Sequence, residues 1–383
     1  MNPLEKIIIE KIKNNGPITF ENFMDMSLYY PGLGYYASAG NKIGREGDFY
    51  TSPHLHPVFG AMIAKQLVEM WTFMEQPPVF HAIEMGAGTG YLCKDIIDHL
   101  NRSSSGEDKH FSKSLRYVIV EPYQYVEELQ RKVIGKFDKN VMWVKSLTDA
   151  TETFSEGLTG CILSNELLDA FPVHLIEMED ELKEIYVDFD GSHFIEVKNK
   201  VSSPELTHYL REFSASLQPG YRTEINLRIK DWLKHLNGVL AKGFIFTIDY
   251  GYAANEYYSE ERSKGTLLCY HRHQANENPY QYIGEQDITA HVNFSSLKKW
   301  GEELGFKTAG YCPQGTFLVA SGIDEVIHEL YSSEPDYLFE IARIKGLIFP
   351  QGMGETHNIM VQYKGERSQV LRGFSLRNNA GQL

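Results

Sequence analysis

The 383-residue sequence contains few cysteines and no long apolar run. Its four cysteines, Cys93, Cys161, Cys269 and Cys312, lie far apart and form no Cys-x-x-Cys pair, so neither a disulfide framework nor a zinc site is predicted. No stretch approaches the roughly 20 apolar residues that a membrane-spanning helix needs. The N-terminal stretch resembles neither a secretory signal nor an Arg-rich transit peptide. We therefore expect reduced thiols and a cytoplasmic location in a bacterial-type cell.

An excess of positive charge is also absent. The chain has 37 Lys and Arg against 51 Asp and Glu, which gives a formal net charge of −14. Because neutralising a phosphate backbone requires concentrated Lys and Arg, we expect no nucleic-acid partner, and a basic protein is the easier fit. Hydrophobic residues at 42% and charged residues at 23% are ordinary for a folded protein.

A strand, a glycine-rich turn and a helix are predicted in succession over residues 79–85, 86–90 and 91–100. This succession opens a doubly wound α/β fold. Further buried strands are predicted over residues 115–120, 141–144, 160–164 and 243–249, and a further helix over 126–134. Their alternation favours a mostly parallel sheet. The Ser-rich stretch 101–113 is predicted to be a polar loop.

The chain is expected to have three parts. Residues 1–76 are predicted to be a mainly helical N-terminal region that contributes to the active site. Residues 77–172 and 241–383 are predicted to form the α/β core. Residues 173–240 are predicted to be an α+β insert for substrate or partner binding, with β-like runs over 175–178 and 184–189. The irregular stretch 252–292 either covers the substrate or is an ordinary exposed excursion.

The turn after the first predicted strand carries three glycines, Gly86, Gly88 and Gly90. Without a Cβ atom, glycine allows a sharp turn and lets a ligand lie against the main chain at a helix N-terminus. A dinucleotide fingerprint, Gly-x-Gly-x-x-Gly, requires glycine at position 91, where this chain has Tyr91. The spacing instead resembles motif I of class I S-adenosylmethionine (AdoMet)-dependent methyltransferases. The alternative is a tight strand-to-helix turn without a ligand.

This resemblance implies a class I, Rossmann-like fold and AdoMet as cofactor. It assigns cofactor binding to Glu84, Gly86, Ala87, Gly88, Thr89 and Gly90. Glu84 would lie near the methionine end of the cofactor, whose ammonium favours a carboxylate. Glu121, at the end of the next strand, resembles motif II and would accept hydrogen bonds from the ribose diol. The alternative for Glu121 is a Glu-Pro turn.

Eight phrases spread over most of the chain together resemble the MidA-like methyltransferases, relatives of the mitochondrial complex I assembly-factor arginine methyltransferase. In the family's order they are residues 47–53 (GDFYTSP), 84–90, 120–122, 165–172 (NELLDAFP), 248–252, 287–294, 314–318 and 353–355. The resemblance implies AdoMet-dependent methylation of an arginine on a partner protein. A respiratory-complex-type subunit is the class of partner that it suggests.

The sequence departs from the family at two places. His54 follows the Thr-Ser-Pro phrase, where the family usually has Glu, and His357-Asn358 stand where it usually has an aromatic residue and Lys. If His54 replaces a carboxylate that contacts the substrate, the family's substrate does not carry over automatically. The cofactor assignment is unaffected.

Methyl transfer from a sulfonium is an in-line displacement that requires alignment and exclusion of water but no metal. An arginine guanidinium, with a pKa above about 12, needs carboxylates to hold its planar fork and accept its proton. Glu166 and Asp169 are the best candidates, because open α/β sheets bind ligands at the ends of their strands. Asp48 is expected to close over the same site, and Asn165 to lie nearest the cofactor. The alternative for Glu166 and Asp169 is a helix N-terminal pair that the helix dipole favours. The alternative for Asp48 is a turn or cap residue.

Other groups carry weaker expectations. Asp249, Tyr250 and Gly251 either border the pocket or form an ordinary turn. His291 orients substrate, acts as a base or is structural. The His271-Arg272-His273 run lacks a third ligand at a recognisable spacing and is rejected as a metal site.

Three competing functions stay open. They are a small-molecule or other macromolecule methyltransferase, a non-catalytic AdoMet-binding assembly factor, and a nicotinamide dehydrogenase, which Tyr91 opposes.

Overall fold

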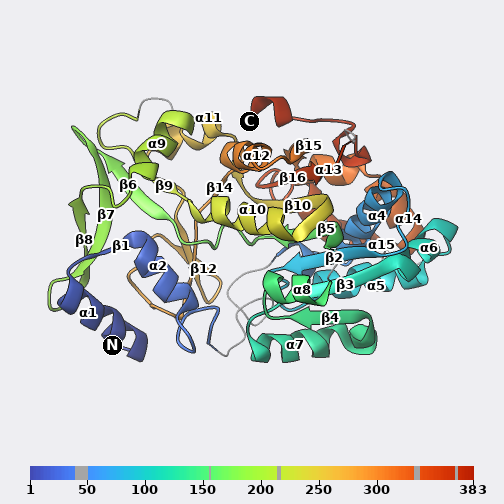
Figure 1. Ribbon diagram of the computed structural model, residues 1–383, viewed down its shortest axis with the longest axis horizontal. Coiled ribbons are helices and arrows are strands. Elements are labelled where there is room, and N and C mark those ends of the chain that lie inside the picture. The colour runs from blue at the N-terminus through green and yellow to red at the C-terminus, as the bar shows by residue number, and fades with distance from the viewer. Residues whose placement is uncertain (39–50, 155–156, 214–216, 332–336, 367–369) are drawn as a thin grey trace. The chain divides into compact units, whose positions relative to one another are not determined.

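The computed structural model describes residues 1–38, 51–154, 157–213, 217–331, 337–366 and 370–383 (Figure 1). The chain divides into two compact units. Unit 1 comprises Met1–Phe49, Leu168–Asp231 and Gly251–Leu297, and unit 2 comprises Tyr50–Leu167, Trp232–Tyr250 and Lys298–Leu383. These divisions differ from the expected boundaries at 76, 172 and 240. Residues 51–76 belong to unit 2, and residues 251–297, expected in the core, belong to unit 1.

The sheet of unit 2 has the order β15-β16-β10-β5-β2-β3-β4. The strands are β2 (Phe80–Met85), β3 (Leu115–Val120), β4 (Val141–Val144), β5 (Leu158–Asn165), β10 (Leu240–Tyr252), β15 (Lys307–Pro313) and β16 (His357–Lys364). The pairs among β4, β3, β2, β5 and β10 are parallel, and β16 is antiparallel to β10 and to β15. This is a doubly wound order of the 3-2-1-4-5-6 type with an antiparallel strand between the last two positions. The predicted α/β class and mostly parallel sheet are confirmed.

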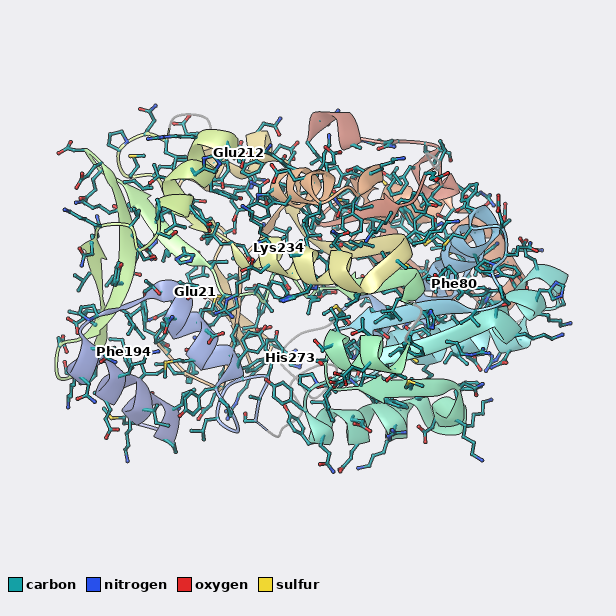
Figure 2. The ribbon with its side chains drawn as sticks, in the orientation of Figure 1. Glu21, Phe80, Phe194, Glu212, Lys234 and His273 are labelled. Carbon is teal, nitrogen blue, oxygen red and sulfur yellow. The ribbon has the colours of Figure 1, made fainter. Side chains whose placement is uncertain are left out.

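Helices alternate with these strands because the strands are apolar on both faces. They are α3 (Ser52–Leu55), α4 (Val58–Phe73), α5 (Tyr91–Arg102), α6 (Gly106–Ser114), α7 (Gln124–Ile134), α8 (Leu147–Thr153), α13 (Gln314–Ala320), α14 (Ile323–Tyr331) and α15 (Tyr337–Ile348). Phe80, labelled in Figure 2, is fully buried at the start of β2, and its ring centroid lies 5.4 Å from that of Phe111. Strands and helices of unit 2 thus share one continuous apolar core.

The stretch 101–113 is not the loop that its serines suggested. It contains α6, which begins after Ser105, whose hydroxyl accepts a hydrogen bond from the backbone N–H of Asp108. Phe111 anchors the helix in the core. The Ser-x-x-Asp spacing is a helix-start signal that outweighed the polar composition.

Unit 1 is built on an antiparallel sheet in the order β1-β7-β6-β9, with β8 also paired to β7. These strands are β1 (Ile18–Thr19), β6 (His174–Met178), β7 (Leu182–Phe189), β8 (Phe194–Asn199) and β9 (Arg222–Ile225). Helices α1 (Pro3–Asn15) and α2 (Phe20–Tyr29) both contact β7. One side of α1 is apolar and buried, and it includes Ile8, Ile9 and Ile12.

The stretch 252–292 is more regular than expected. It holds a small sheet of β11 (Leu268–His271), β12 (Gln274–Asn276) and β13 (Asp287–Thr289), and β14 (Val292–Asn293) pairs with the end of β10. Unit 1 also contains α9 (Pro204–Phe213) and α11 (Ala254–Tyr257). Helices α10 (Arg228–Val239) and α12 (Phe294–Glu303) continue from unit 1 into unit 2. Glu21, labelled in Figure 2, accepts a 2.8 Å hydrogen bond from the Arg228 Nε at the start of α10.

Within the described residues, no helix combines the length and apolarity required to cross a bilayer.

Candidate functional site

The glycine loop joins the end of β2 to the N-terminus of α5. Gly86, Gly88 and Gly90 have φ values of 72°, 52° and 87°, all in the left-handed region that favours glycine. A Cβ at Gly86 would lie 3.0 Å from the Leu167 side chain. The backbone therefore turns as the motif predicted, and the first N–H groups of α5 are directed out of the helix end.

Glu84 is buried beneath this loop. Its side chain accepts a 2.7 Å hydrogen bond from the Tyr117 hydroxyl, and Glu84 is only 3% exposed. Burial raises the pKa of Glu84 from its ordinary 4.5 to about 7, and the bond from Tyr117 partly opposes this rise. A cationic group beside Glu84 would favour its ionised form.

Glu121 at the end of β3 is tied to the same loop through Gln130. Gln130 Nε2 donates to Glu121 Oε2 at 2.9 Å and to the Gly88 carbonyl at 3.0 Å. Trp143 Nε1 donates to Gln130 Oε1 at 2.9 Å, which fixes the amide. Burial raises the pKa of Glu121 to about 7, against the hydrogen bonds that it accepts from Tyr123 and Gln130. Gln130 therefore joins the residues of motifs I and II by hydrogen bonds.

Asn165 and Glu166 follow at the carboxyl end of β5. Asn165 pairs in register with Ile248 of β10, and the Glu166 N–H donates to the Ile248 carbonyl at 2.9 Å. Glu166 has a φ of 50°, which is rare for a residue with a side chain and is a recurrent feature of functional sites. Asn165 Nδ2 donates to Glu166 Oε1 at 3.3 Å. The Asn165 Oδ1 atom is buried without a hydrogen-bond partner in the described part of the chain.

The Glu166 carboxylate is surrounded by residues from distant parts of unit 2. Its Oε1 atom lies 3.4 Å from the backbone N–H nitrogen of Ser52 on α3 and 3.4 Å from His357 Nε2 on β16. The side chains of Glu166 and His357 are 5% and 0% exposed. Ser52 is itself held by a 3.0 Å hydrogen bond from its hydroxyl to Gln314 Oε1. Ser52, from the phrase at 47–53, and His357 of β16 thus contact the carboxylate of the phrase at 165–172, and Gln314 of a third phrase supports Ser52.

His54 links α3 to the glycine loop. Its Nδ1 atom lies 2.7 Å from Thr51 Oγ1 and its Nε2 atom 3.1 Å from Thr89 Oγ1. Its ring makes an edge contact with Tyr91, with centroids 5.0 Å apart. Burial lowers the pKa of His54, and the nearby Glu166 carboxylate partly opposes this effect. The imidazole is therefore neutral near pH 7, where a glutamate would add a second negative charge.

The remaining candidates belong to different parts of the chain. Asp169 belongs to unit 1, where it lies near Tyr36; the Tyr36 hydroxyl donates to Asp287 at 2.9 Å, and burial with both carboxylates raises the pKa of Tyr36. Asp48 lies outside the described residues. Asp249 Oδ2 accepts the Leu167 N–H at 3.2 Å, so it supports the turn that carries Glu166. His291 belongs to unit 1.

Three residues around the site were not singled out from the sequence: Tyr117, Gln130 and Trp143. All lie on ordinary strands and helices, and no local spacing marks them. His357 was noted as a departure from the family but was not placed at Glu166. Among the described residues, no group of three or more His, Cys, Asp or Glu is arranged to hold a metal ion.

The residues of the glycine loop fit AdoMet. The left-handed glycines leave space at a helix N-terminus, Glu84 suits the ammonium, and the buried Asn165 Oδ1 offers an acceptor to a donor from the ligand. AdoMet supplies an electrophilic methyl group when bound. The protein's own residues hold it, orient the nucleophile and manage its proton.

Comparisons with known proteins agree with this arrangement. The model of a family described as S-adenosyl-L-methionine-dependent methyltransferases matches residues 62–312. A crystal structure from Burkholderia thailandensis bound to S-adenosyl-homocysteine superposes with a TM-score of 0.89 at 30% identity. The match covers 99% of this chain and 96% of that one.

Curated relatives match over similar lengths. The protein arginine methyltransferase NDUFAF7 of Mus musculus is 26% identical over 100% of this chain and 88% of its own length. The Drosophila melanogaster homologue is 26% identical over 94% of this chain and 85% of its own length. Fold, loop geometry and these matches lead to one conclusion: the chain belongs to this family, resembles the MidA-like proteins, and is an AdoMet-dependent methyltransferase.

Proposed function

We propose that this methyltransferase transfers the methyl group to an arginine of a partner protein. The full-length relatives named as protein arginine methyltransferases support this choice of substrate. The net charge of −14 is compatible with a basic protein partner. A respiratory-complex-type subunit is the partner class that the family resemblance suggests, and we propose that the reaction takes place in the cytoplasm.

The observation that carries the proposal is the buried Glu166 carboxylate beside the glycine loop. A guanidinium has five N–H donors and no acceptor, so it is recognised by clustered acceptors. Glu166 Oε1 and His357 Nε2 provide two such acceptors 3.4 Å apart. A carboxylate beside a guanidinium also leaves electron density on the nitrogen that attacks the methyl group, because it holds the positive charge on the other nitrogens.

The test combines label transfer with analysis of the product. Purified protein and AdoMet labelled in its methyl group are incubated with a lysate, and labelled polypeptides are hydrolysed to identify the methylated amino acid. We expect methylarginine from the wild type. Glu166→Gln should lose transfer while retaining S-adenosylhomocysteine binding, whereas the exposed control Glu128→Gln should behave like the wild type.

Other outcomes separate the alternatives. Label confined to a low-mass or RNA fraction would replace the protein substrate by another acceptor. S-adenosylhomocysteine formed only in stoichiometric amounts with every fraction would favour a non-catalytic assembly factor. Undiminished transfer by Glu166→Gln would remove Glu166 from the mechanism.

A further inference from the structure

His357 is the first residue of β16 and lies against β10. It pairs in register with Tyr250, and the centroids of the two rings are 3.9 Å apart. Its side chain is completely buried. The ring therefore has one well-defined orientation, in which Nε2 points to the Glu166 carboxylate and Nδ1 to the Thr356 hydroxyl.

The contacts of Thr356 are compatible with the Nδ1–H tautomer of this imidazole. The Thr356 oxygen lies 3.4 Å from the Gly352 carbonyl, to which its hydroxyl can donate, and 3.2 Å from His357 Nδ1. When the hydroxyl donates to Gly352, its oxygen can accept a hydrogen bond from Nδ1–H. A neutral imidazole carries one ring proton, so Nε2 then presents its lone pair.

In this tautomer two acceptors face each other in a buried place. His357 Nε2 lies 3.4 Å from Glu166 Oε1 and has no hydrogen-bond partner in the described part of the chain. An unsatisfied buried acceptor of this kind costs free energy unless a donor arrives. The donor that fits is an N–H group or a proton shared between the two.

We propose that His357 Nε2 accepts the proton that the substrate nitrogen releases during methyl transfer, which rests on the function proposed above. The nitrogen–methyl bond forms while the sulfur–methyl bond breaks, and that bonding pair passes to sulfur. The N–H bond breaks, its pair stays on nitrogen, and its proton moves to Nε2. Glu166 stabilises the imidazolium until the proton leaves to solvent.

The charges around the ring are consistent with this role. Glu166 contacts Nε2, while Tyr250 lies on the face of the ring. Asp249 supports the Glu166 turn, and His54 lies close enough to Glu166 to be influenced by its charge. The Glu166 carboxylate therefore interacts with both imidazoles. A proton delivered to His357 forms an ion pair with Glu166 because the two groups are in contact.

The experiment compares His357→Phe with the wild type. Phenylalanine keeps an aromatic ring against Tyr250 but removes the proton acceptor. General-base catalysis contributes about 10²–10⁴-fold, so we expect kcat to fall at least about 100-fold while the affinity for S-adenosylhomocysteine stays unchanged. The dependence of kcat on pH should also differ between the wild type and His357→Phe. The exposed control His110→Phe should change neither quantity.

A substrate-free measurement distinguishes this proposal from the proposed function. Long-range proton–nitrogen spectra of the protein saturated with S-adenosylhomocysteine, assigned through His357→Phe, should show the Nδ1–H tautomer. An Nε2–H tautomer, or an unchanged kcat and pH profile in His357→Phe, would overturn the role of His357. Absence of protein labelling by the wild type would contradict the proposed function. The tautomer measurement would still show whether Nε2 of His357 can accept a proton.

Discussion

The glycine loop and the surroundings of Glu166, both in unit 2, differ in how their polar groups form hydrogen bonds. Around the loop, the Glu84 and Glu121 carboxylates receive protein donors, from Tyr117 and Gln130 respectively. Around Glu166, the acceptors Asn165 Oδ1 and His357 Nε2 have no partner among the described residues. The first region is preorganised before ligand binding, whereas the second has acceptors that a ligand can complete. The first region has the geometry of a cofactor loop, and the second is where we propose that the substrate binds.

The largest expected effect concerns the loop backbone. Gly86→Val places a β-branched side chain at a φ of 72° and against Leu167. Such strain costs about 1–3 kcal/mol, so calorimetry should show S-adenosylhomocysteine affinity reduced about tenfold to a hundredfold. Gly106→Ala is the control, because a Cβ there meets no atom within 4 Å. Normal binding by Gly86→Val would mean that the loop does not hold the cofactor.

The next effect concerns the link between the two cofactor motifs. Gln130→Leu removes the donor to Glu121 and Gly88 and leaves Trp143 Nε1 without its acceptor. Leaving buried groups unsatisfied costs about 1–3 kcal/mol, so the free energy of unfolding in urea should fall by about that amount. Cofactor affinity should fall with it, and the exposed control Gln124→Leu should change neither. If stability falls but affinity does not, Gln130 is a packing residue only.

The smallest effect is a pH dependence of cofactor binding. Since burial raises the pKa of Glu84 to about 7, its carboxyl is mainly protonated at pH 6 and ionised at pH 8. The ammonium of the ligand favours the ionised form, so affinity should rise about tenfold over this interval and binding at pH 6 should release protons. Glu84→Gln should remove the Glu84 contribution to this dependence. Without ligand the sign is opposite: the stability contributed by the raised pKa is present below about pH 4.5 and lost as the pH rises through 7.

If the wild-type affinity for S-adenosylhomocysteine did not change with pH, Glu84 would not be the group that binds the ammonium of the ligand. Titration in two buffers with different ionisation enthalpies measures the proton release directly. Retention of the full pH dependence by Glu84→Gln would instead direct attention to Glu121, whose pKa burial also raises to about 7.

Local sequence patterns predicted the strands, the glycine turn and the AdoMet assignment. The strands Leu115–Val120 and Val141–Val144 were predicted with the bounds that the structure has. The glycine loop was predictable because its function depends on neighbouring residues and on backbone angles that only glycine adopts readily. Position in the strand order likewise placed Glu166 at a ligand-binding strand end.

The tertiary structure decided which distant residues complete the site. His357 meets Glu166 because β16 enters the sheet antiparallel beside β10, and no local spacing in the chain records that pairing. The same holds for Gln130, which reaches both Gly88 and Glu121 from α7. Sequence periodicity reports which face of an element is apolar, but the partner of a buried polar atom depends on how separate elements pack. The cofactor could therefore be predicted from one short loop, whereas the proposed proton acceptor, His357, could be identified only from the packing of the folded sheet.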